Sequence, residues 1–342
     1  MNSRERIGSI FSRKPADRVG FWTGNPHADT KRDYTARLDL PDIEAFYLRL
    51  GDDCRWIPAD GGYKHPEGLP AFNPIVGLKG AFDCTNMAAL PGRFAETVDI
   101  AEIEAHEWPN PDYLDFTNII AEIRTHQNRA VFTGMWTCFF HVVADYFGME
   151  VYFANMHLRP DLVDAVTDHV VGFYEAANNR FLEQLGDAAD VFFLGNDFGT
   201  QLSLLISPEQ FKRFVLPGFK KNIDIAKKFG KKVMLHSCGA IREVIPLLID
   251  AGIDGLHPLQ AQAVGMDAET LAREFKNDIV FCGGVDTQHL LHKGTPQEIR
   301  DEVRRLKDVL GPLYIVSPSH EAILPNVPIE NVIAMAEAAT EI

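Results

Sequence analysis

The sequence predicts an α/β protein that folds as a single (β/α)8 TIM barrel spanning residues 1–342. Strand-like and helix-like segments alternate from about Tyr113 to the end of the chain, and four successive apolar strands each lead into polar residues. Repeated strand–helix units imply parallel strands with right-handed crossovers, and the length suits about eight such units. An open doubly wound sheet is the alternative, but the chain contains neither a Gly-x-Gly-x-x-Gly turn nor a phosphate-binding Gly-x-x-x-x-Gly-Lys loop.

The first part of the chain is expected to be less regular than the rest. An amphipathic N-terminal helix (MNSRERIGSIF) precedes a strand at 18–22, a helix at 41–50 and a strand at 54–57. Gly, Pro and Asn are then frequent between residues 61 and 93. We expect an irregular insertion there, either a lid or a hairpin.

From residue 113 the alternation is clear. We expect helices at 113–127, from about 139, at 160–185 and at 241–251, and strands at 130–132, 191–194, from 233, at 255–259, at 279–282 and at 313–316. Gly283-Gly284 should end the strand at 279–282. Ser207 and Thr295 each precede a Pro and stand three residues before a Gln or Glu, which predicts two capped helix starts.

Charge and cysteine content exclude several classes of protein. Asp and Glu number 48 against 33 Lys and Arg, a formal net charge of -15, which repels nucleic acid and anionic membranes. No run of about 18 apolar residues is present, so we expect a cytoplasmic protein. Five scattered cysteines are an odd number, which favours reduced thiols over a disulfide framework.

A His-x-Cys pair follows the strand that begins near Val233. His236 and Cys238 are two positions apart, so their side chains are expected on the same side, and both are donors that zinc accepts. The alternative is a hydrogen-bonded histidine beside a buried thiol. His320, in a Ser-Pro-Ser-His turn after the last strand, is the best third ligand, although a loop histidine can simply be exposed. Cys282 is a rival ligand unless strand alternation directs it into the barrel wall.

Other polar residues lie at the same predicted rim, where (β/α)8 barrels hold their active sites. Asp197 and Gln201 follow the strand at 191–194 and could contact substrate. Asp286 could orient a metal-bound histidine or accept a proton, or could instead cap the next helix. Gln260 ends the strand at 255–259.

Aromatic residues follow the strand at 130–132. Trp136 and His141 stand on either side of Phe139 and Phe140 in the sequence. This group could form one wall of a pocket for a flat ligand, although core packing explains the two Phe residues equally well. We therefore include Trp136 and His141 among the candidate substrate-binding residues.

At these residues the chain resembles the uroporphyrinogen decarboxylase superfamily of (β/α)8 barrels, over nearly its whole length and most strongly from Gly195 onward. One branch decarboxylates a tetrapyrrole without a metal, and its Met-Arg-Gln-Ala-Gly-Arg signature after the first strand holds substrate carboxylates. The corresponding segment here, residues 21–27, reads Phe-Trp-Thr-Gly-Asn-Pro-His and has no arginine. Without that clamp, several propionates would lack cationic partners.

The other branch looks like the coenzyme M methyltransferases, which use zinc to transfer methyl groups from corrinoids to thiols. It carries His-x-Cys, a Glu after the next strand and a Cys near the C-terminus. His236 and Cys238 match the first two positions, whereas Gln260 replaces the Glu and His320 replaces the last Cys. These replacements leave less negative charge around a metal, so the site is a firmer expectation than the metal or the methyl acceptor.

The resemblance therefore implies a zinc-dependent methyltransferase that acts on a small molecule and a corrinoid such as methylcobalamin. His236, Cys238 and His320 would hold the metal, and Gln260 would line its open side. The usual corrinoid-binding Asp-x-His-x-x-Gly pattern is absent, so a corrinoid protein would be a separate partner. Two alternatives stay open: a metal-free decarboxylase or lyase that uses Asp197 or Asp286, and a non-catalytic corrinoid- or tetrapyrrole-binding protein.

Overall fold

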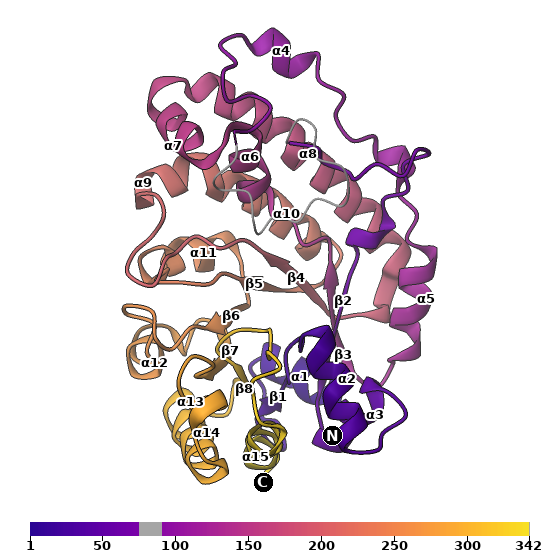
Figure 1. Cartoon of the computed structure of the whole chain (residues 1–342), viewed down its shortest axis with the longest axis vertical. Helices are drawn as coiled ribbons and strands as arrows, with labels where there is room; N and C mark the ends of the chain where they lie inside the picture. The colour runs from indigo at the N-terminus through magenta and orange to yellow at the C-terminus, as the bar shows by residue number, and fades with distance from the viewer. Residues whose placement is uncertain (75–90, 342) are drawn as a thin grey trace.

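The computed structural model describes residues 1–74 and 91–341, and in them eight parallel strands form a (β/α)8 barrel (Figure 1). The order around the sheet is β1-β8-β7-β6-β5-β4-β3-β2. The strands are β1 (Gly20–Phe21), β2 (Cys54–Pro58), β3 (Ala130–Gly134), β4 (Val191–Gly195), β5 (Lys232–His236), β6 (Gly255–Leu259), β7 (Val280–Val285) and β8 (Tyr314–Pro318). The predicted fold class is therefore confirmed.

The barrel closes between β1 and β2 through two neighbouring carboxylates as well as the backbone. The amide of Asp53 donates to the carbonyl of Phe21 at 2.9 Å. The carboxylate of Asp53 accepts from the Phe21 amide at 3.0 Å, and that of Asp52 accepts from the Thr23 amide at 2.8 Å. β1 is only two residues long. These side-chain bonds supply pairing that a short strand does not.

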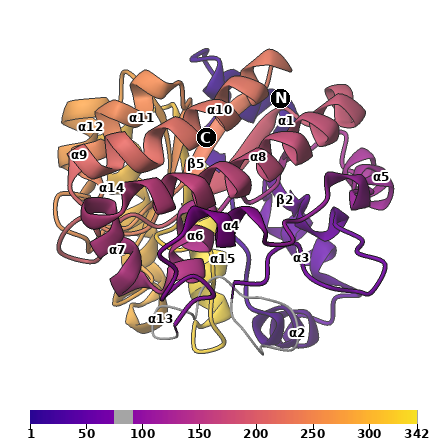
Figure 2. The same cartoon turned by 90° about the horizontal axis from the view of Figure 1, so that it is seen from above.

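Helices cover the outside of the barrel, and α8 is the longest of those described. It contacts α4, α6, α7 and α10. These helices form the upper part of the molecule in Figure 1, and in Figure 2 they lie across the face turned to the viewer. The helices are α1 (Ser3–Phe11), α2 (Ala28–Arg37), α3 (Ile43–Leu50), α4 (Ile100–Glu104), α5 (Thr117–Thr125), α6 (Phe139–Phe147), α7 (Met149–Leu158), α8 (Pro160–Leu185), α9 (Pro208–Gln210), α10 (Leu216–Lys228), α11 (Ile245–Ala251), α12 (Ala268–Phe275), α13 (Leu290–Lys293), α14 (Pro296–Leu310) and α15 (Ile329–Thr340).

The N-terminal helix α1 packs against the barrel interior. Ile7, Ile10 and Phe11 belong to the same buried cluster as the inward side chains of the strands. Two strand glycines make room for them. A Cβ at Gly20 would lie 2.7 Å from Ile7, and one at Gly255 would lie 2.9 Å from Phe11. The helix therefore fills the end of the barrel opposite the strands' C-terminal rim.

Most element boundaries follow the sequence predictions, with one instructive difference. Both predicted capping boxes are present, at Ser207 and at Thr295. The strand expected to break at Gly283-Gly284 instead continues to Val285 as β7. Both glycines have positive φ, and the β6–β7 pairing shifts register between Leu256 and Leu259. The two glycines allow a bulge within the strand rather than ending it.

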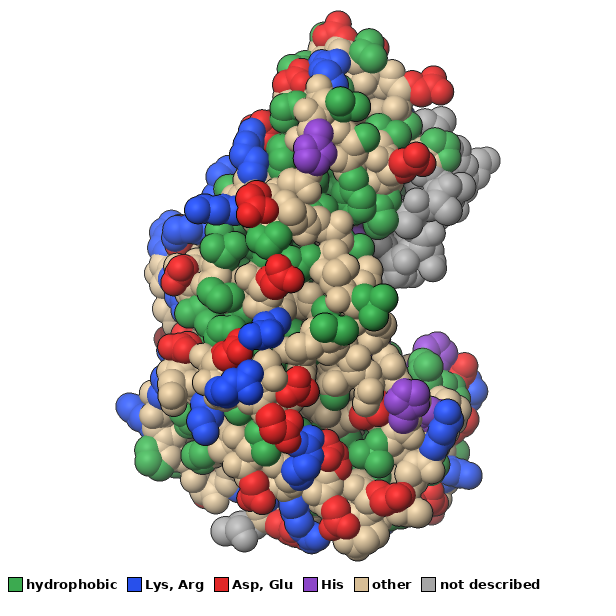
Figure 3. Space-filling model, turned by 90° about the vertical axis from the view of Figure 1, so that its left-hand side faces the viewer, with side chains coloured by type: hydrophobic (Ala, Val, Ile, Leu, Met, Phe, Trp, Pro, Cys, Tyr) green, Lys and Arg blue, Asp and Glu red, His purple; other side chains and the backbone are tan. Residues whose placement is uncertain are grey.

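Of the expected insertion at 61–93, residues 75–90 lie outside the described part of the chain. On the face shown in Figure 3, acidic and basic side chains are interspersed, with hydrophobic side chains between them. Within the described residues, no helix has the length and apolar character needed to cross a membrane.

Candidate metal centre

Three potential metal ligands converge at the C-terminal rim of the barrel. His236 is the last residue of β5, Cys238 follows it, and Asp197 comes from the loop after β4. Their ligand atoms all lie within 4.8 Å of one another. The Nε2 of His236 is 3.5 Å from the Sγ of Cys238 and 3.3 Å from an oxygen of Asp197. Asp197 also accepts the amide proton of Cys238 at 2.9 Å.

Two glycines allow these loops to approach so closely. A Cβ on Gly199 would lie 2.7 Å from the backbone nitrogen of Ala240, and one on Gly239 would lie 2.3 Å from the backbone of Gly199. The Ala240 amide donates to the carbonyl of Thr200 at 2.8 Å. Larger side chains would force the backbones apart, so the glycines set the distance between Asp197 and Cys238.

His257 orients His236 from the neighbouring strand. The two residues are paired across β5 and β6, and their Nδ1 atoms are 3.0 Å apart. Burial, together with His236, lowers the pKa of His257 well below its usual value, so its ring is neutral. A neutral His257 can accept a hydrogen bond from the Nδ1–H of His236, and the Nε2 of His236 then faces Cys238 and Asp197.

His320 and Glu321 complete the cluster from the loop after β8. A hydrogen bond with Cys238 raises the pKa of His320 above its usual value. Glu321 lies 3.5 Å from His320 and 3.9 Å from the Nδ1 of His236. The structure thus places the predicted third histidine beside the His-x-Cys pair, although the three mutually closest ligand atoms belong to Asp197, His236 and Cys238.

Three neighbouring groups favour the protonated form of His236. Burial opposes protonation, yet Cys238, Glu321 and Asp197 together raise the pKa of His236 well above its usual value. For Asp197, burial would raise the pKa, but the hydrogen bond and charge of His236 lower it well below its usual value. A field that stabilises a proton on this imidazole would also stabilise a metal cation.

The donor set suits zinc, and two of its three ligand-atom separations match a tetrahedral ion, while the third is bounded by 4.8 Å. A tetrahedral zinc with bonds of about 2.0 Å to nitrogen or oxygen and about 2.3 Å to sulfur holds its ligand atoms roughly 3.3–3.6 Å apart. The separations of 3.3 and 3.5 Å around the Nε2 of His236 fall in that range. One imidazole, one thiolate and one carboxylate leave a fourth position for His320 or for substrate.

The remaining predicted polar residues lie on the same rim in other roles. The side-chain oxygen of Gln260 accepts the amide proton of Gly239 at 2.5 Å, so Gln260 fixes the loop that carries Cys238. Gln201 is exposed, and its carbonyl accepts from the Val264 amide. Asp286 is buried and bonds to the Gln262 side chain at 3.1 Å and to the Gln288 amide at 2.8 Å. Among the described residues, it shares no hydrogen bond or ion pair with the histidines of the cluster.

Cys282, the rival ligand, points elsewhere. It is fully buried in the barrel-interior cluster, where burial raises the pKa of its thiol. A thiol of raised pKa in apolar surroundings is a poor metal ligand. Strand alternation therefore directs Cys282 into the barrel.

The predicted aromatic group borders the cluster. The ring of Trp136 lies 5.0 Å from that of His236. His141, in the first turn of α6, is close enough to Asp197 and His236 to be influenced by both, while burial lowers its pKa. His257 and Glu321 were not singled out from the sequence. His257 stands within an apolar strand. The one sign of its role is that it pairs with His236 on the neighbouring strand.

The chain belongs to the uroporphyrinogen decarboxylase (URO-D) family, whose model matches residues 89–342. A solved structure described as a methyltransferase from Methanosarcina mazei has the same fold, with a TM-score of 0.65 over 99% of this chain and 98% of that one, at 16% identity.

Two curated relatives show which members of the family the chain is similar to. One is the methylcobamide:CoM methyltransferase MtbA of Methanosarcina acetivorans, 24% identical over 167 residues that span 49% of this chain and 46% of the relative. The other is a methylated-thiol–coenzyme M methyltransferase of Methanosarcina mazei, 27% identical over 183 residues that span 52% of this chain and 43% of the relative. The matched segments thus span less than half of each relative's length.

Proposed function

We propose that this chain is a zinc-dependent methyltransferase that moves a methyl group between a small organic molecule and a corrinoid cofactor or a separate corrinoid protein. Methyltransferases among the relatives support the reaction type. The observation that carries the proposal is the convergence of Asp197, His236 and Cys238 at the barrel rim, with ligand atoms within 4.8 Å.

His236, Cys238 and Asp197 would hold the metal, with His320 beside them as the predicted further ligand. When bound, zinc would act as a Lewis acid that lowers the pKa of a thiol acceptor or polarises the heteroatom of a methylated donor. The protein's own residues supply orientation. His257 fixes the His236 ring, and Gln260 fixes the loop of Cys238.

Substrate orientation is assigned to residues around this centre. The oxygen of Asp197 that accepts from the Cys238 amide is the one that faces His236. The other oxygen of Asp197 would contact the substrate. Gln201 and Asp286 occupy the loops after β4 and β7 and would contact the substrate at the rim. Trp136 packs beside His236, with ring centroids 5.0 Å apart, and would contact a substrate bound at this centre.

The metal content of purified variants tests the ligand set. Wild type is expected to retain one zinc per chain, and His236→Ala and Cys238→Ala are each expected to lose it, because each removes one close donor. Cys282→Ala is the matched control, since it removes a thiol that is buried in the barrel interior. An unchanged zinc content in both site variants would reject this ligand set.

A metal-free lyase or decarboxylase is the second candidate from the sequence, and the same family includes decarboxylases. The segment after β1 has no arginine to bind carboxylates. Turnover of a carboxylated substrate after exhaustive chelation would favour the lyase. Loss of methyl transfer on chelation, with recovery on addition of zinc, would favour the methyltransferase.

A further inference from the structure

The ring of His320 is oriented by its own loop. The backbone amide of Ala322 donates a hydrogen bond to the Nδ1 of His320 at 3.2 Å. A ring nitrogen that accepts such a bond uses its lone pair for it and carries no hydrogen. The hydrogen of a neutral His320 ring is therefore on Nε2.

The neighbouring carboxylate of Glu321 does not change this assignment. Its oxygen lies 3.5 Å from the Nδ1 of His320, which is longer than the usual range of about 2.7–3.2 Å for a hydrogen bond of this kind. A hydrogen on Nδ1 would also point at the N–H of Ala322. Adding a second proton to the ring would leave the hydrogen on Nε2 in place, so Nε2 carries a hydrogen in either charge state.

The Nε2 of His320 serves Cys238. The ring of His320 forms a hydrogen bond with Cys238, and its Nδ1 is already occupied by the Ala322 amide. The donor in this bond is consequently the Nε2–H, and the acceptor is the sulfur. A nitrogen that carries a hydrogen has no lone pair to offer a metal.

The spacing of the cluster agrees with this role. Among the described residues, one set of three potential ligands has all of its ligand atoms within 4.8 Å of one another, and it consists of Asp197, His236 and Cys238. His320 contacts Cys238 without joining that set. It therefore lacks the close spacing to every other ligand that a tetrahedral ion requires.

Building on the proposed function, we infer that His320 is a positioning residue that donates a hydrogen bond from Nε2 to the sulfur of Cys238, and not a ligand of the metal as the sequence predicts. A hydrogen bond to a metal-bound thiolate withdraws negative charge from the sulfur and lowers its nucleophilicity. Cys238 then remains a ligand and does not take the methyl group in place of the acceptor.

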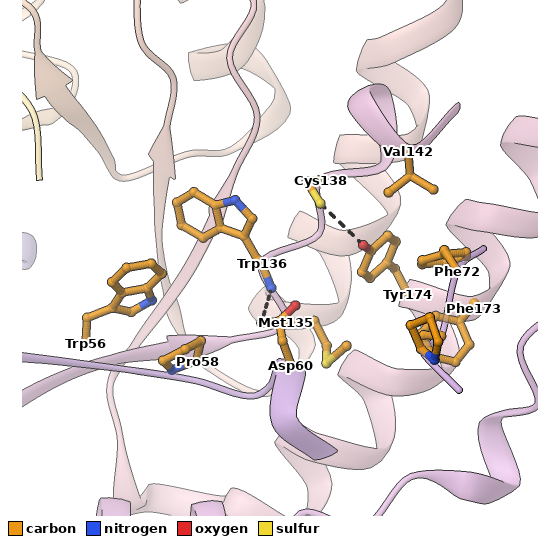
Figure 4. A pocket seen from close by; sticks show the side chains of 12 residues that line it. Trp56, Pro58, Asp60, Phe72, Met135, Trp136, Cys138, Val142, Phe173 and Tyr174 are labelled. Atoms are coloured by element: carbon orange, nitrogen blue, oxygen red, sulfur yellow. Dashed lines mark hydrogen bonds between the residues drawn. The ribbon is translucent and has the colours of Figure 1, made fainter. Parts of the chain in front are cut away.

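An aromatic pocket lies beyond the Trp136 indole and offers no fourth ligand in place of His320. Two of its described lining residues, Asp60 and Cys138, have potential ligand atoms. Asp60 accepts from the Trp136 amide at 2.9 Å, and Cys138 bonds to the hydroxyl of Tyr174 at 3.6 Å (Figure 4). The fourth position of the metal is thus left for the substrate.

Long-range proton–nitrogen NMR spectra of the purified, zinc-loaded full chain test the tautomer directly. The ring signals of His320, identified by their loss in His320→Gln, should show a hydrogen on Nε2 and none on Nδ1. A metal ligand would show zinc on Nε2 and the hydrogen on Nδ1, and that result would overturn the inference. If wild type binds no zinc, the proposed function is rejected, while the ring spectra of the zinc-free chain still decide the tautomer.

Cobalt(II) in place of zinc tests the effect on the sulfur. His320→Ala should keep one metal per chain, but its sulfur-to-cobalt charge-transfer band should move to longer wavelength because the sulfur loses its hydrogen bond. His320→Gln, whose side-chain N–H can reach the same sulfur, should restore the band. The control is His65→Ala, which removes a histidine with the same local bond, here to the Glu67 amide at 3.1 Å, and should leave the band unchanged.

The reactivity of Cys238 completes the test. In the zinc-loaded protein, iodoacetamide should label Cys238 about threefold or more faster in His320→Ala than in wild type, as measured by peptide mass spectrometry. Loss of metal from both His320 variants at an unchanged urea midpoint, or an unchanged band and labelling rate in His320→Ala, would overturn the inference. The expected shifts without methyl transfer in any of the proteins would leave the role of His320 standing and reject the proposed function.

Discussion

At the scale of single residues, the two ring nitrogens of His236 have different tasks. Nδ1 lies 3.0 Å from His257, while Nε2 faces Cys238 and Asp197. Hydrogen bonding of one nitrogen fixes the tautomer and thereby directs the lone pair of the other. The imidazole is thus oriented before any metal arrives.

Gln260 offers a residue-scale test of such support. Gln260→Ala leaves the Gly239 amide without its acceptor, and the loop that carries Cys238 should loosen. We expect zinc affinity to fall by about tenfold or more, as for other residues that support metal ligands. Competition with a chromophoric chelator measures the change. Gln260→Glu retains an acceptor oxygen and should retain the affinity; equal affinities in all three proteins would contradict this role.

His106 should make stability depend on pH. The ring of His106 packs against aromatic rings that include Phe94 and Trp108. Burial there lowers the pKa of His106 to about 4. Because the folded-state pKa lies below the unfolded value of about 6.5, the unfolded chain binds more protons between these values. The free energy of unfolding is therefore unaffected by His106 above about pH 6.5, and it decreases as the pH falls from 6.5 towards 4.

The variant His106→Phe removes this term and keeps the ring packing. Since His106 is only partly buried, we expect the loss of unfolding free energy between about pH 7.5 and pH 5 to shrink by roughly 1 kcal/mol. Urea unfolding at the two pH values measures it. An unchanged pH dependence would assign the acid sensitivity to other groups.

Some of these residues could be identified from sequence and others could not. His236, Cys238 and Asp197 each follow an apolar strand directly, which indicates the rim of a barrel. His257 lies inside a strand, and recognising it requires the register between β5 and β6, which the sequence does not encode locally. The acceptor role of Gln260 depends on a loop conformation that is set by Gly239.

At the scale of elements, the loops after β4 and β5 act as one unit. Their backbones touch at Gly199 and Gly239, and the Phe198 amide donates to the hydroxyl of Ser237 at 3.1 Å. The distance between Asp197 and Cys238 therefore depends on the packing of two backbones rather than on either side chain alone.

Gly199→Ala should disturb this unit. Its Cβ would lie 2.7 Å from the Ala240 nitrogen, a contact that only backbone movement can relieve. We expect a loss of stability of about 1–3 kcal/mol and a zinc affinity reduced by roughly tenfold. Gly172→Ala, in α8 with nothing within 4 Å of its Cβ, is the matched control and should stabilise by about 0.5–1 kcal/mol. Unchanged affinity in Gly199→Ala would show that the loops position their ligands independently.

At the scale of the whole molecule, the barrel is closed by a buried ion network at its first two strands. Asp53 has no exposed side-chain surface and pairs with Arg6 at 2.6 Å and Arg18 at 2.8 Å, besides accepting from Phe21. Arg6 belongs to α1, so the N-terminal helix, β1 and β2 meet at one carboxylate. Neither the number of strands nor their periodicity could predict this buried ion network.

Asp53→Ala should destabilise the whole barrel. It removes the buried carboxylate that Arg6 and Arg18 share and leaves Arg6 with Asp17 alone, so we expect a cost of about 3–5 kcal/mol. The more exposed pair of Arg4 and Asp190 provides the control, because Asp190→Ala should cost less, about 1 kcal/mol. Denaturant unfolding of both variants measures the difference; similar small losses would show that closure does not depend on Asp53.

The fold of the whole chain was predictable because alternating strands and helices leave few topologies, and the resemblance to its family agrees with that pattern. The aromatic pocket on the same rim as the candidate metal centre was only partly predictable. Because Trp136 follows a strand, it was expected to form one wall of a pocket. Trp56, Phe72 and Phe173 come from three further segments that only the fold brings together.

X-ray absorption at the zinc edge of the purified protein tests the central claim most directly. A metal held by His236, Cys238 and Asp197 should show one sulfur at about 2.3 Å and nitrogen or oxygen ligands at about 2.0–2.1 Å. In Cys238→Ala, the sulfur contribution should disappear. A bound zinc with no sulfur ligand in wild type, or one whose sulfur signal survives that substitution, would contradict the account.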